Sequence, residues 1–273
     1  MSSGSFKVIN IYRRVFGGKR FYRFNRAMYF LSLRGLGIGN WETSELSGEK
    51  FFINRFVRHV KIPTVIDVGA NVGKYSEMIK SLAPEATIYA FEPHPQTYKR
   101  LKESADRLGY TAVNAACGAE IGTAALYDHG GGQSETGTEH ASLIKDVIES
   151  VHKDTSRAWN IEVTTVDRFV DDNAVEHIDL LKIDVEGGEM NVLLGAANSL
   201  NKQMIDTIHF EFTEANTVSR TFMKDFYSML PNFDFYRMLP DGLVQMGPYY
   251  SLTSEIFAYQ NIVAVRKGCG EWV

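Results

Sequence analysis

Cysteine is scarce in this sequence of 273 residues, and long apolar runs are missing. The two cysteines, Cys117 and Cys269, lie far apart, which excludes a disulfide-built scaffold and favours a reducing, cytoplasmic setting. No apolar run is long enough to span a bilayer, and the first residues, MSSGSFKVIN, lack the apolar stretch of a secretory signal. With 44% hydrophobic residues, the chain can form the core of one large domain, or of a domain with an appendage.

Acidic residues are absent from the first 41 positions. This stretch has a charge of +8 and the remainder −12, which together give the net charge of −4. Apolar residues recur at helical spacing over 8–16, 21–31 and 52–60, and the last of these patterns stops before Pro63. We therefore expect a basic, aromatic helical segment over residues 1–62 and a separate domain over 63–273. The eight basic residues are Lys7, Arg13, Arg14, Lys19, Arg20, Arg23, Arg26 and Arg34.

From residue 64 onward, strand patterns alternate with helix patterns. This alternation predicts an α/β fold with a mostly parallel sheet that helices cover on both faces. The region 128–142, rich in Gly, Ser and Thr, is expected to be a loose loop, with an amphipathic helix over 143–151. The expected strands are 64–68, 87–93, 111–118, 123–129, 178–187, 206–214, 233–239 and 256–267, and the expected helices are 75–82, 98–108, 190–194 and 222–230.

The stretch TVIDVGANVGKYSEMIKSL, residues 64–82, joins a buried strand to a helix through two glycines four residues apart. A glycine turn of this kind lets a ligand approach bare backbone at a helix N-terminus, where free N–H groups favour negative charge. A dinucleotide site would have the pattern G-x-G-x-x-G. Here Asn71 replaces the middle glycine and the third is absent, so a pyrophosphate fits poorly and a single carboxylate fits better.

Glu92 lies at the end of the second strand, about 20 residues after the glycine turn, where a ribose-binding carboxylate belongs. A ligand with a ribose, an adenine and an amino-acid end, but without phosphates, is S-adenosylmethionine. Asp67, on the first strand, is positioned to face the ammonium group of that ligand.

At this point the sequence resembles the FkbM family of S-adenosylmethionine-dependent methyltransferases. The resemblance covers residues 64–214 and rests on DVGANVGKYS, FEPHPQTYKRL, LKIDVEGGEMNVLLGA and HFEF in this order. It implies the class I methyltransferase fold, with a Rossmann-like, seven-stranded sheet whose last strand is antiparallel to its neighbours. It also implies O-methyl transfer to a hydroxyl of a sugar or glycan-type acceptor, in surface polysaccharide or natural-product biosynthesis.

The cofactor is expected to lie between the glycine turn and the ends of the second and third strands. Gly69 and Gly73 form the turn under its methionine end, Glu92 binds the ribose, and Asn71 either binds the cofactor's carboxylate or caps the helix. Cys117 is interpreted as a small apolar filler rather than a reactive thiol. The full set of expected cofactor-binding residues is Asp67, Gly69, Asn71, Gly73, Tyr75, Glu92, Pro93, Asn114, Ala116, Cys117 and Asp184.

Asp184 is the first candidate for the base that accepts the proton of the acceptor hydroxyl, because it ends a central strand beside the expected methyl group. Glu186 could do the same, although capping of the following helix comes first, and Glu189 is expected to complement the helix dipole. Glu211 could contact the acceptor, whereas His209 on the same side of that strand is expected to be a core histidine bonded to a carboxylate.

The fourth catalytic candidate is His140, in the loose loop, for which simple exposure is the competing interpretation. No carboxylate cluster has the spacing of a dedicated metal site, so no metal is expected.

The basic front end has three interpretations. It could bind a membrane surface, contact a polyanionic acceptor, or pack on the domain with its charges in water. Nucleic acid is not expected as a partner, because the body of the chain is acidic and has no recognisable binding motif. Two other functions compete with methyl transfer: a catalytically silent S-adenosylmethionine-binding protein, and a nicotinamide-dependent enzyme, which Asn71 disfavours.

Overall fold

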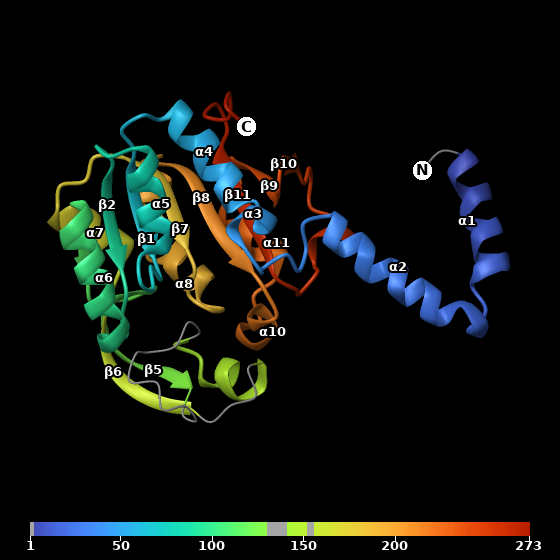
Figure 1. Cartoon of the computed structure of the whole chain (residues 1–273), viewed down its shortest axis with the longest axis horizontal. Coiled ribbons are helices and arrows are strands. Elements are labelled where there is room, and N and C mark those ends of the chain that lie inside the picture. The colour runs from blue at the N-terminus through green and yellow to red at the C-terminus, as the bar shows by residue number, and fades with distance from the viewer. Residues whose placement is uncertain (1–2, 130–140, 152–155) are drawn as a thin grey trace.

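The computed structural model describes residues 3–129, 141–151 and 156–273, and its centre is an eight-stranded sheet in the order β10-β9-β11-β8-β7-β1-β2-β3 (Figure 1). The predicted α/β class is confirmed. The sheet has one strand more than the expected seven, because β10 follows β9 directly in a hairpin across Pro240 and Asp241. The strands are β1 (Thr64–Val68), β2 (Thr87–Phe91), β3 (Thr111–Val113), β7 (Ile178–Ile183), β8 (Ile205–Phe212), β9 (Phe233–Leu239), β10 (Gly242–Gln245) and β11 (Gln260–Arg266).

Strand direction follows the expected pattern. β3, β2, β1, β7 and β8 pair in parallel, whereas β11 is antiparallel to both β8 and β9. The reversed last strand is therefore confirmed. Parallel strands direct all their carboxyl ends to one edge of the sheet, and this edge is where ligands bind in open α/β folds.

Helices cover both faces of the sheet, because alternate strand residues are apolar on each side. Val65 and Leu180 pack with α4 and α5 on one face, while Ile66 and Leu181 pack with α7, α8 and α11 on the other. The helices are α4 (Glu49–His59), α5 (Lys74–Leu82), α6 (Pro95–Leu108), α7 (Val166–Asp172), α8 (Glu189–Leu194), α9 (Ala197–Asn201), α10 (Ala215–Ser219), α11 (Met223–Met229) and α12 (Ser251–Ser254).

A second, three-stranded sheet lies beyond the carboxyl ends of the parallel strands (Figure 1). It consists of β4 (Ala116–Cys117), β6 (Ser156–Thr164) and β5 (Gly122–His129), and β6 falls where no strand was expected. The expected helix at 143–151 is present only as a short helical stretch that contains the π-helix η2 (Val147–Val151). Residues 130–140 of the expected loop lie outside the described part of the chain.

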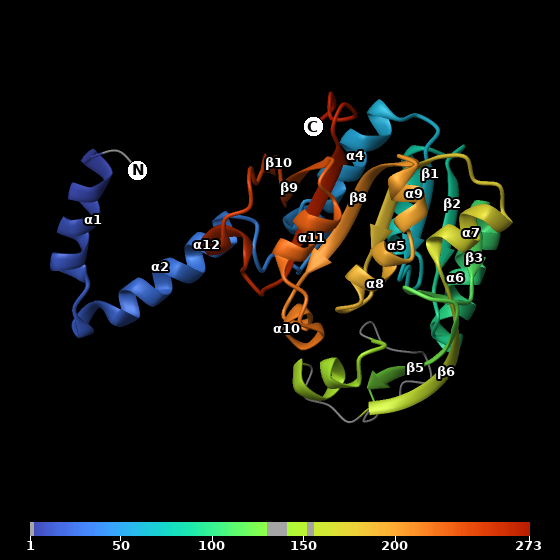
Figure 2. The same cartoon turned by 180° about the vertical axis from the view of Figure 1, so that it is seen from behind.

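The front of the chain divides into two parts. α1 (Ser3–Phe16), η1 (Lys19–Phe21) and α2 (Tyr22–Gly35) project away from the domain in both views (Figures 1 and 2). α3 (Ser44–Ser47) and α4 instead belong to the domain, since Phe52 and Phe56 are buried in its core. Residues 36–62 therefore pack with the domain, while 3–35 stand apart from it. No helix in the described ranges has the length and apolar character needed to cross a membrane.

Candidate active site

The turn after β1 brings three strand ends close together. Gly69 has a φ of 81°, and a Cβ atom there would lie 1.8 Å from the carbonyl oxygen of Asp184, so only glycine fits between β1 and β7. The N–H groups of Gly69 and Ala70 both donate to the carbonyl of Phe91 at the end of β2. Gly73, with a φ of 91°, is the N-cap of α5. Asn71 therefore does not cap the helix, and the cofactor interpretation of Asn71 stays a prediction.

Three polar residues follow one another across the sheet next to this turn. Asp67 on β1 pairs in register with Lys182 on β7, which pairs with His209 on β8. Alternation along the strands puts all three, together with Glu211, on the face covered by α4 and α5. A chain of polar groups at the carboxyl end of an otherwise apolar sheet indicates a functional site rather than a packing solution.

A cavity of about 650 Å³ opens above these residues. Its wall includes Asp67, Tyr75, Lys182, Glu211 and Tyr259, together with the segment before α4. A smaller cavity of about 80 Å³ continues from it toward Glu92, Pro93 and Ala141. Four residues line both cavities: Gly69, Asn71, Asp184 and Glu186. Part of the predicted cofactor and catalytic set thus lines two adjoining cavities, which we call the hollow.

Lys182 is the residue in this hollow that the sequence analysis missed. Its side chain is buried, and its Nζ lies 3.2 Å from Asp184 Oδ2 and 5.6 Å from the centre of the Tyr75 ring. Burial lowers the pKa of Lys182, but Asp184, Glu211 and other carboxylates outweigh this effect and raise it. Within the described residues, Nζ makes no hydrogen bond of adequate geometry. A lone cation in the apolar run LLKIDV was the signal that could have identified it.

The surrounding carboxylates hold their protons unusually firmly. Burial raises the pKa of Asp67 to about 6, although Ser76 Oγ donates to Asp67 Oδ2 at 2.6 Å and Lys182 opposes the shift. Burial and then Asp184 raise the pKa of Glu211 well above its usual value. Glu49, at the start of α4, is shifted in the same direction by burial. The site therefore has more acids than lysines, and it is suited to receive a cation.

His209 is a buried core histidine, as expected, but its partners differ from the expected carboxylate. Its Nδ1 lies 3.0 Å from the Tyr75 hydroxyl and its Nε2 lies 2.9 Å from Asn261 Oδ1. Burial, and then Lys182, lowers the pKa of His209 well below its usual value, so the ring stays neutral. Its function in the unliganded domain is to hold Tyr75 in place.

Glu92 ends β2 with its carboxylate turned back toward the glycine turn. It accepts hydrogen bonds from the N–H of Asn71 at 3.0 Å and from the N–H of His94 at 2.8 Å. Burial raises the pKa of Glu92 to about 7 despite these bonds. Asn114 Nδ2 donates to the carbonyl oxygen of Glu92 at 2.8 Å and so supports the same strand end.

The turn between β7 and α8 is held by Glu189. Its Oε1 accepts from the N–H of Gly187 at 3.0 Å, and burial raises the pKa of Glu189 to about 7. The N-cap of α8 is Gly188, and the structure shows the carboxylate of Glu189, not that of Glu186, on the backbone amides of this turn. Glu186 has a left-handed φ of 51° and lines both cavities.

Not every predicted residue reaches the hollow. Ala116 and Cys117 are buried, and Cys117 belongs to the main core, where burial raises the pKa of its thiol. Neither residue lines the two cavities, and nor does Asn114. Gly73 lies behind the turn, against Tyr110. His140 lies outside the described residues. Their roles in cofactor binding or catalysis stay predictions.

A possible cation-binding group lies elsewhere, at the amino-terminal ends of β7 and β8. His177, Asp179 and Asp206 are the one such group in the described ranges. Asp206 is already held by Arg266 and lies 3.0 Å from His177 Nε2, so these contacts account for the group as an ion-pair network. It is remote from the hollow, and the expectation of a metal-independent site remains a prediction.

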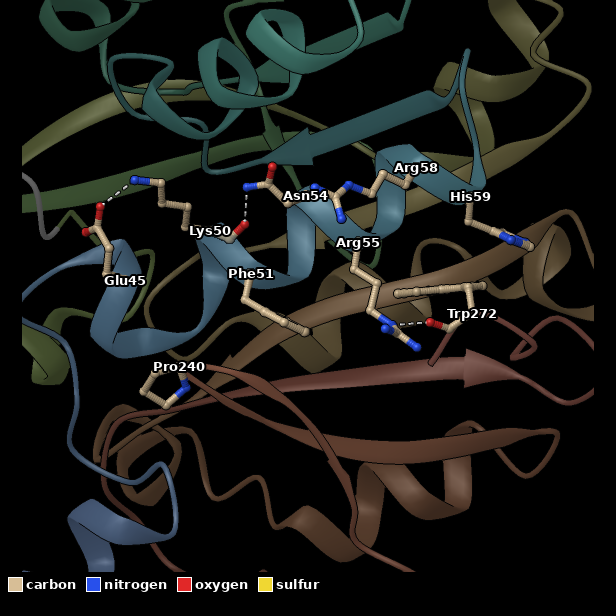
Figure 3. Close-up of a pocket in the computed structure, with 9 residues that line it drawn as sticks. All are labelled: Glu45, Lys50, Phe51, Asn54, Arg55, Arg58, His59, Pro240 and Trp272. Carbon is tan, nitrogen blue, oxygen red and sulfur yellow. Dashed lines mark hydrogen bonds and ion pairs between the residues drawn. The ribbon is translucent and has the colours of Figure 1, made fainter.

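A cavity of about 630 Å³ lies on the outer side of α4, against Pro240 and Trp272 (Figure 3). Two of its basic residues already have partners: Lys50 pairs with Glu45 at 2.8 Å, and Arg55 donates to the carbonyl of Trp272. No predicted site residue lines it. Although its volume is similar to that of the larger cavity around Asp184, we do not consider it a second candidate active site.

Comparisons with known proteins identify the family of the chain. Residues 67–239 match the methyltransferase FkbM domain. Over 161 residues the chain is 27% identical to a hexuronic acid methyltransferase of Haloferax volcanii, and this covers 59% of the chain and 61% of that relative. A 2-O-methyltransferase of Sinorhizobium fredii is 21% identical over 66% of the chain and 76% of its own length. A solved FkbM methyltransferase from Methylobacillus flagellatus superimposes with a TM-score of 0.48 at 12% identity, covering 75% of the chain and 44% of its own.

Proposed function

Because the chain belongs to the FkbM methyltransferase family, we propose that it transfers the methyl group of S-adenosylmethionine to a hydroxyl of a sugar or glycan-type acceptor. The observation that carries the proposal is the pair of joined cavities that share Gly69, Asn71, Asp184 and Glu186. One cavity leads to the ribose-type carboxylate of Glu92, and the other is large enough for an acceptor. The shared residues surround the position where the two ligands would meet.

The residues present fit the cofactor in charge and in shape. S-adenosylmethionine has two positive groups and one negative group, and the hollow has an excess of carboxylates around one lysine. Glu92 would accept from the ribose hydroxyls, since each carboxylate oxygen can accept a further bond beside its backbone N–H. Asp67 would face the ammonium group, and the turn at Gly69, which lines both cavities, would contact the amino-acid end. The bound cofactor supplies an already activated methyl group.

The protein contributes positioning and removal of one proton. Asp184 is the best placed acceptor of that proton, because it lines both cavities and its side chain is 37% exposed, so it is within reach of a ligand. The Lys182 ammonium, 3.2 Å from Asp184 Oδ2, forms an ion pair that helps to hold this carboxylate in position. Among the described residues, the Lys182 ammonium has an ion pair with Asp184 but no hydrogen bond of adequate geometry, and an oxygen of a bound ligand would provide one. Glu211, whose pKa burial raises, also lines the larger cavity and could form a hydrogen bond with the acceptor.

The names of the relatives support a carbohydrate acceptor. One is named for a hexuronic acid and another for a 2-O position. The matched region spans only about three fifths of the first of these proteins. A carbohydrate acceptor is therefore a proposal for this chain. Glu211 and Thr213 in the cavity wall could form hydrogen bonds with the hydroxyl groups of such a ligand.

Transfer of labelled methyl groups from the cofactor to a panel of uronic acids, oligosaccharides and glycolipids tests the proposal. We expect label in at least one carbohydrate with the wild type, and at least a 100-fold lower rate with Asp184→Asn, since removing a general base costs about 10²–10⁴ in rate. Asp225→Asn, on α11 outside the hollow, is the matched control. Tight cofactor binding without transfer to any acceptor would favour the catalytically silent alternative, and absence of cofactor binding would refute the assignment.

A further inference from the structure

The arm formed by α1, η1 and α2 is not packed on the domain. None of the side chains described between residues 7 and 36 is buried, and both views show the arm pointing away from the sheet (Figures 1 and 2). This contradicts the interpretation in which the front end simply covers the domain. Large apolar side chains are left in water instead: Val8 is 67% exposed and Leu31 is 65% exposed.

The arm nevertheless has a defined shape of its own. The centroid of the Phe16 ring lies 5.0 Å from the ring centroid of Tyr12 and 5.0 Å from that of Phe21. These aromatic contacts fix the corner between the helices. The Tyr12 hydroxyl donates to Asn25 Oδ1 at 2.6 Å, and Asn25 Nδ2 donates to the carbonyl of Phe16 at 2.8 Å. A corner built from such contacts presents the two helices as one unit to a partner.

α1 separates apolar from charged residues around its axis. At 3.6 residues per turn, Val8, Ile11 and Val15 fall on one side, Arg13 falls on the opposite side, and Lys7 and Arg14 flank the apolar stripe. All three apolar residues are exposed, at 67%, 64% and 46% respectively. This is the arrangement of a helix that lies in a membrane–water interface with its apolar side toward the lipid.

Charge decides which occupant fits this surface. The arm carries eight basic residues and no acidic one, while the rest of the chain is at −12. A second copy of the arm would bring a second set of eight positive charges to the same surface, and nucleic acid would leave the apolar side uncovered. An anionic bilayer satisfies both features, because its headgroups attract Lys and Arg and its interior receives the apolar side chains.

We propose that residues 3–35 dock the protein on the surface of an anionic lipid bilayer. The acidic domain would be held off that surface by like charge while the arm stays bound. The proposal is independent of methyl transfer, so its failure would leave the proposed activity intact.

Sedimentation of the full chain with vesicles tests this docking. We expect binding to vesicles with about one third anionic lipid, little binding to neutral phosphatidylcholine, and release as salt rises from about 0.1 M to about 0.5 M. The variant Arg13→Gln/Arg14→Gln/Arg23→Gln should bind on the order of 100-fold more weakly, at about fivefold per charge. The variant Val8→Ser/Ile11→Ser should also lose binding, because the apolar contribution is removed.

The matched control is Arg100→Gln/Lys202→Gln/Lys224→Gln, which removes the same charge from exposed positions on the domain. It should bind like the wild type. Equal loss in the control, salt-insensitive binding to neutral vesicles, or no binding at all would overturn the proposal. Self-association of the full chain in ultracentrifugation that disappears in Val8→Ser/Ile11→Ser, without vesicle binding, would identify a second copy as the occupant and overturn it as well.

Discussion

Replacing Glu92 by Gln should weaken cofactor binding and remove most of its pH dependence. Glu92 is 7% exposed, and burial raises its pKa to about 7. Only the ionised carboxylate can accept hydrogen bonds from both ribose hydroxyls while it also accepts hydrogen bonds from the N–H groups of Asn71 and His94. The fraction of protein competent to bind therefore rises with pH, and the apparent affinity rises with it.

The size of the effect follows from that pKa. With a pKa of about 7, the ionised fraction is about 0.09 at pH 6 and about 0.9 at pH 8, so the affinity of the wild type should rise about tenfold. Exchanging two charge-assisted hydrogen bonds for neutral ones costs about 2–3 kcal/mol, or a Kd about 30- to 150-fold higher in Glu92→Gln at pH 8.

Isothermal titration calorimetry of S-adenosylmethionine at several pH values between 6 and 8 is the assay. Glu85→Gln, at an exposed position between α5 and β2, is the matched control, because it removes one carboxylate without touching the hollow. The amino group of the ligand also titrates near this range, and comparison with Glu92→Gln separates its contribution. Wild-type affinity that is flat or falls with pH, or a Gln variant that binds like the wild type, would refute the reasoning.

Three further outcomes are expected. Asp184→Asn should lower kcat by about 10²–10⁴ with any carbohydrate that the wild type methylates, while the calorimetric Kd for the cofactor changes little; an equal loss in both would show that Asp184 binds rather than acts as a base. Lys182→Met should lower the free energy of unfolding by about 3 kcal/mol, because it leaves the carboxylates of Asp184 and Glu211 without their cation. Urea titration should show a smaller loss at pH 5.5 than at pH 8, because Asp67, whose pKa burial raises to about 6 against the opposing charge of Lys182, is more often protonated at pH 5.5. A pH-independent loss would contradict this cause. Glu189 has its pKa raised to about 7 by burial, so the stability that its proton provides is full below pH ~4.5 and lost as pH rises through ~7. In urea titrations the free energy of unfolding of the wild type should decline by up to about 3 kcal/mol between these pH values, and Glu189→Gln should remove this decline. A decline that is unchanged in the variant would show that other groups cause it.

The sequence sufficed for features that depend on neighbours in the chain. The strand–turn–helix unit around Gly69 was predictable because two glycines interrupt two apolar periodicities within one short stretch. The position of Glu92 at the end of the second strand was predictable because this strand follows the strand–turn–helix unit directly in the chain. The reversed last strand, in contrast, rested on the resemblance to a known family.

Features that depend on distant pairings were not predictable. β6 was missed because residues 130–155 separate it in the sequence from its pairing partner β5. His209 was expected to bond a carboxylate, but Asn261 reaches it from β11, 52 residues later in the chain. Lys182 was overlooked because nothing local shows that Asp67, Asp184 and Glu211 will surround it. In each case the deciding neighbour arrives through the tertiary fold.

The acids of the hollow couple stability, protonation and ligand binding into one equilibrium. Burial raises the pKa of Asp67 to about 6 and that of Glu92 to about 7, so the unliganded domain gives up stability as these groups ionise toward neutral pH. A cationic ligand favours the ionised forms, and its binding adds stability according to its concentration relative to Kd. The ligand should therefore stabilise the domain more at pH 8 than at pH 6, because there it also offsets the cost of the ionised acids. A hollow selected only for folding would not retain this cost, and its presence at the carboxyl ends of β1 and β2 is itself an argument that a cation binds there.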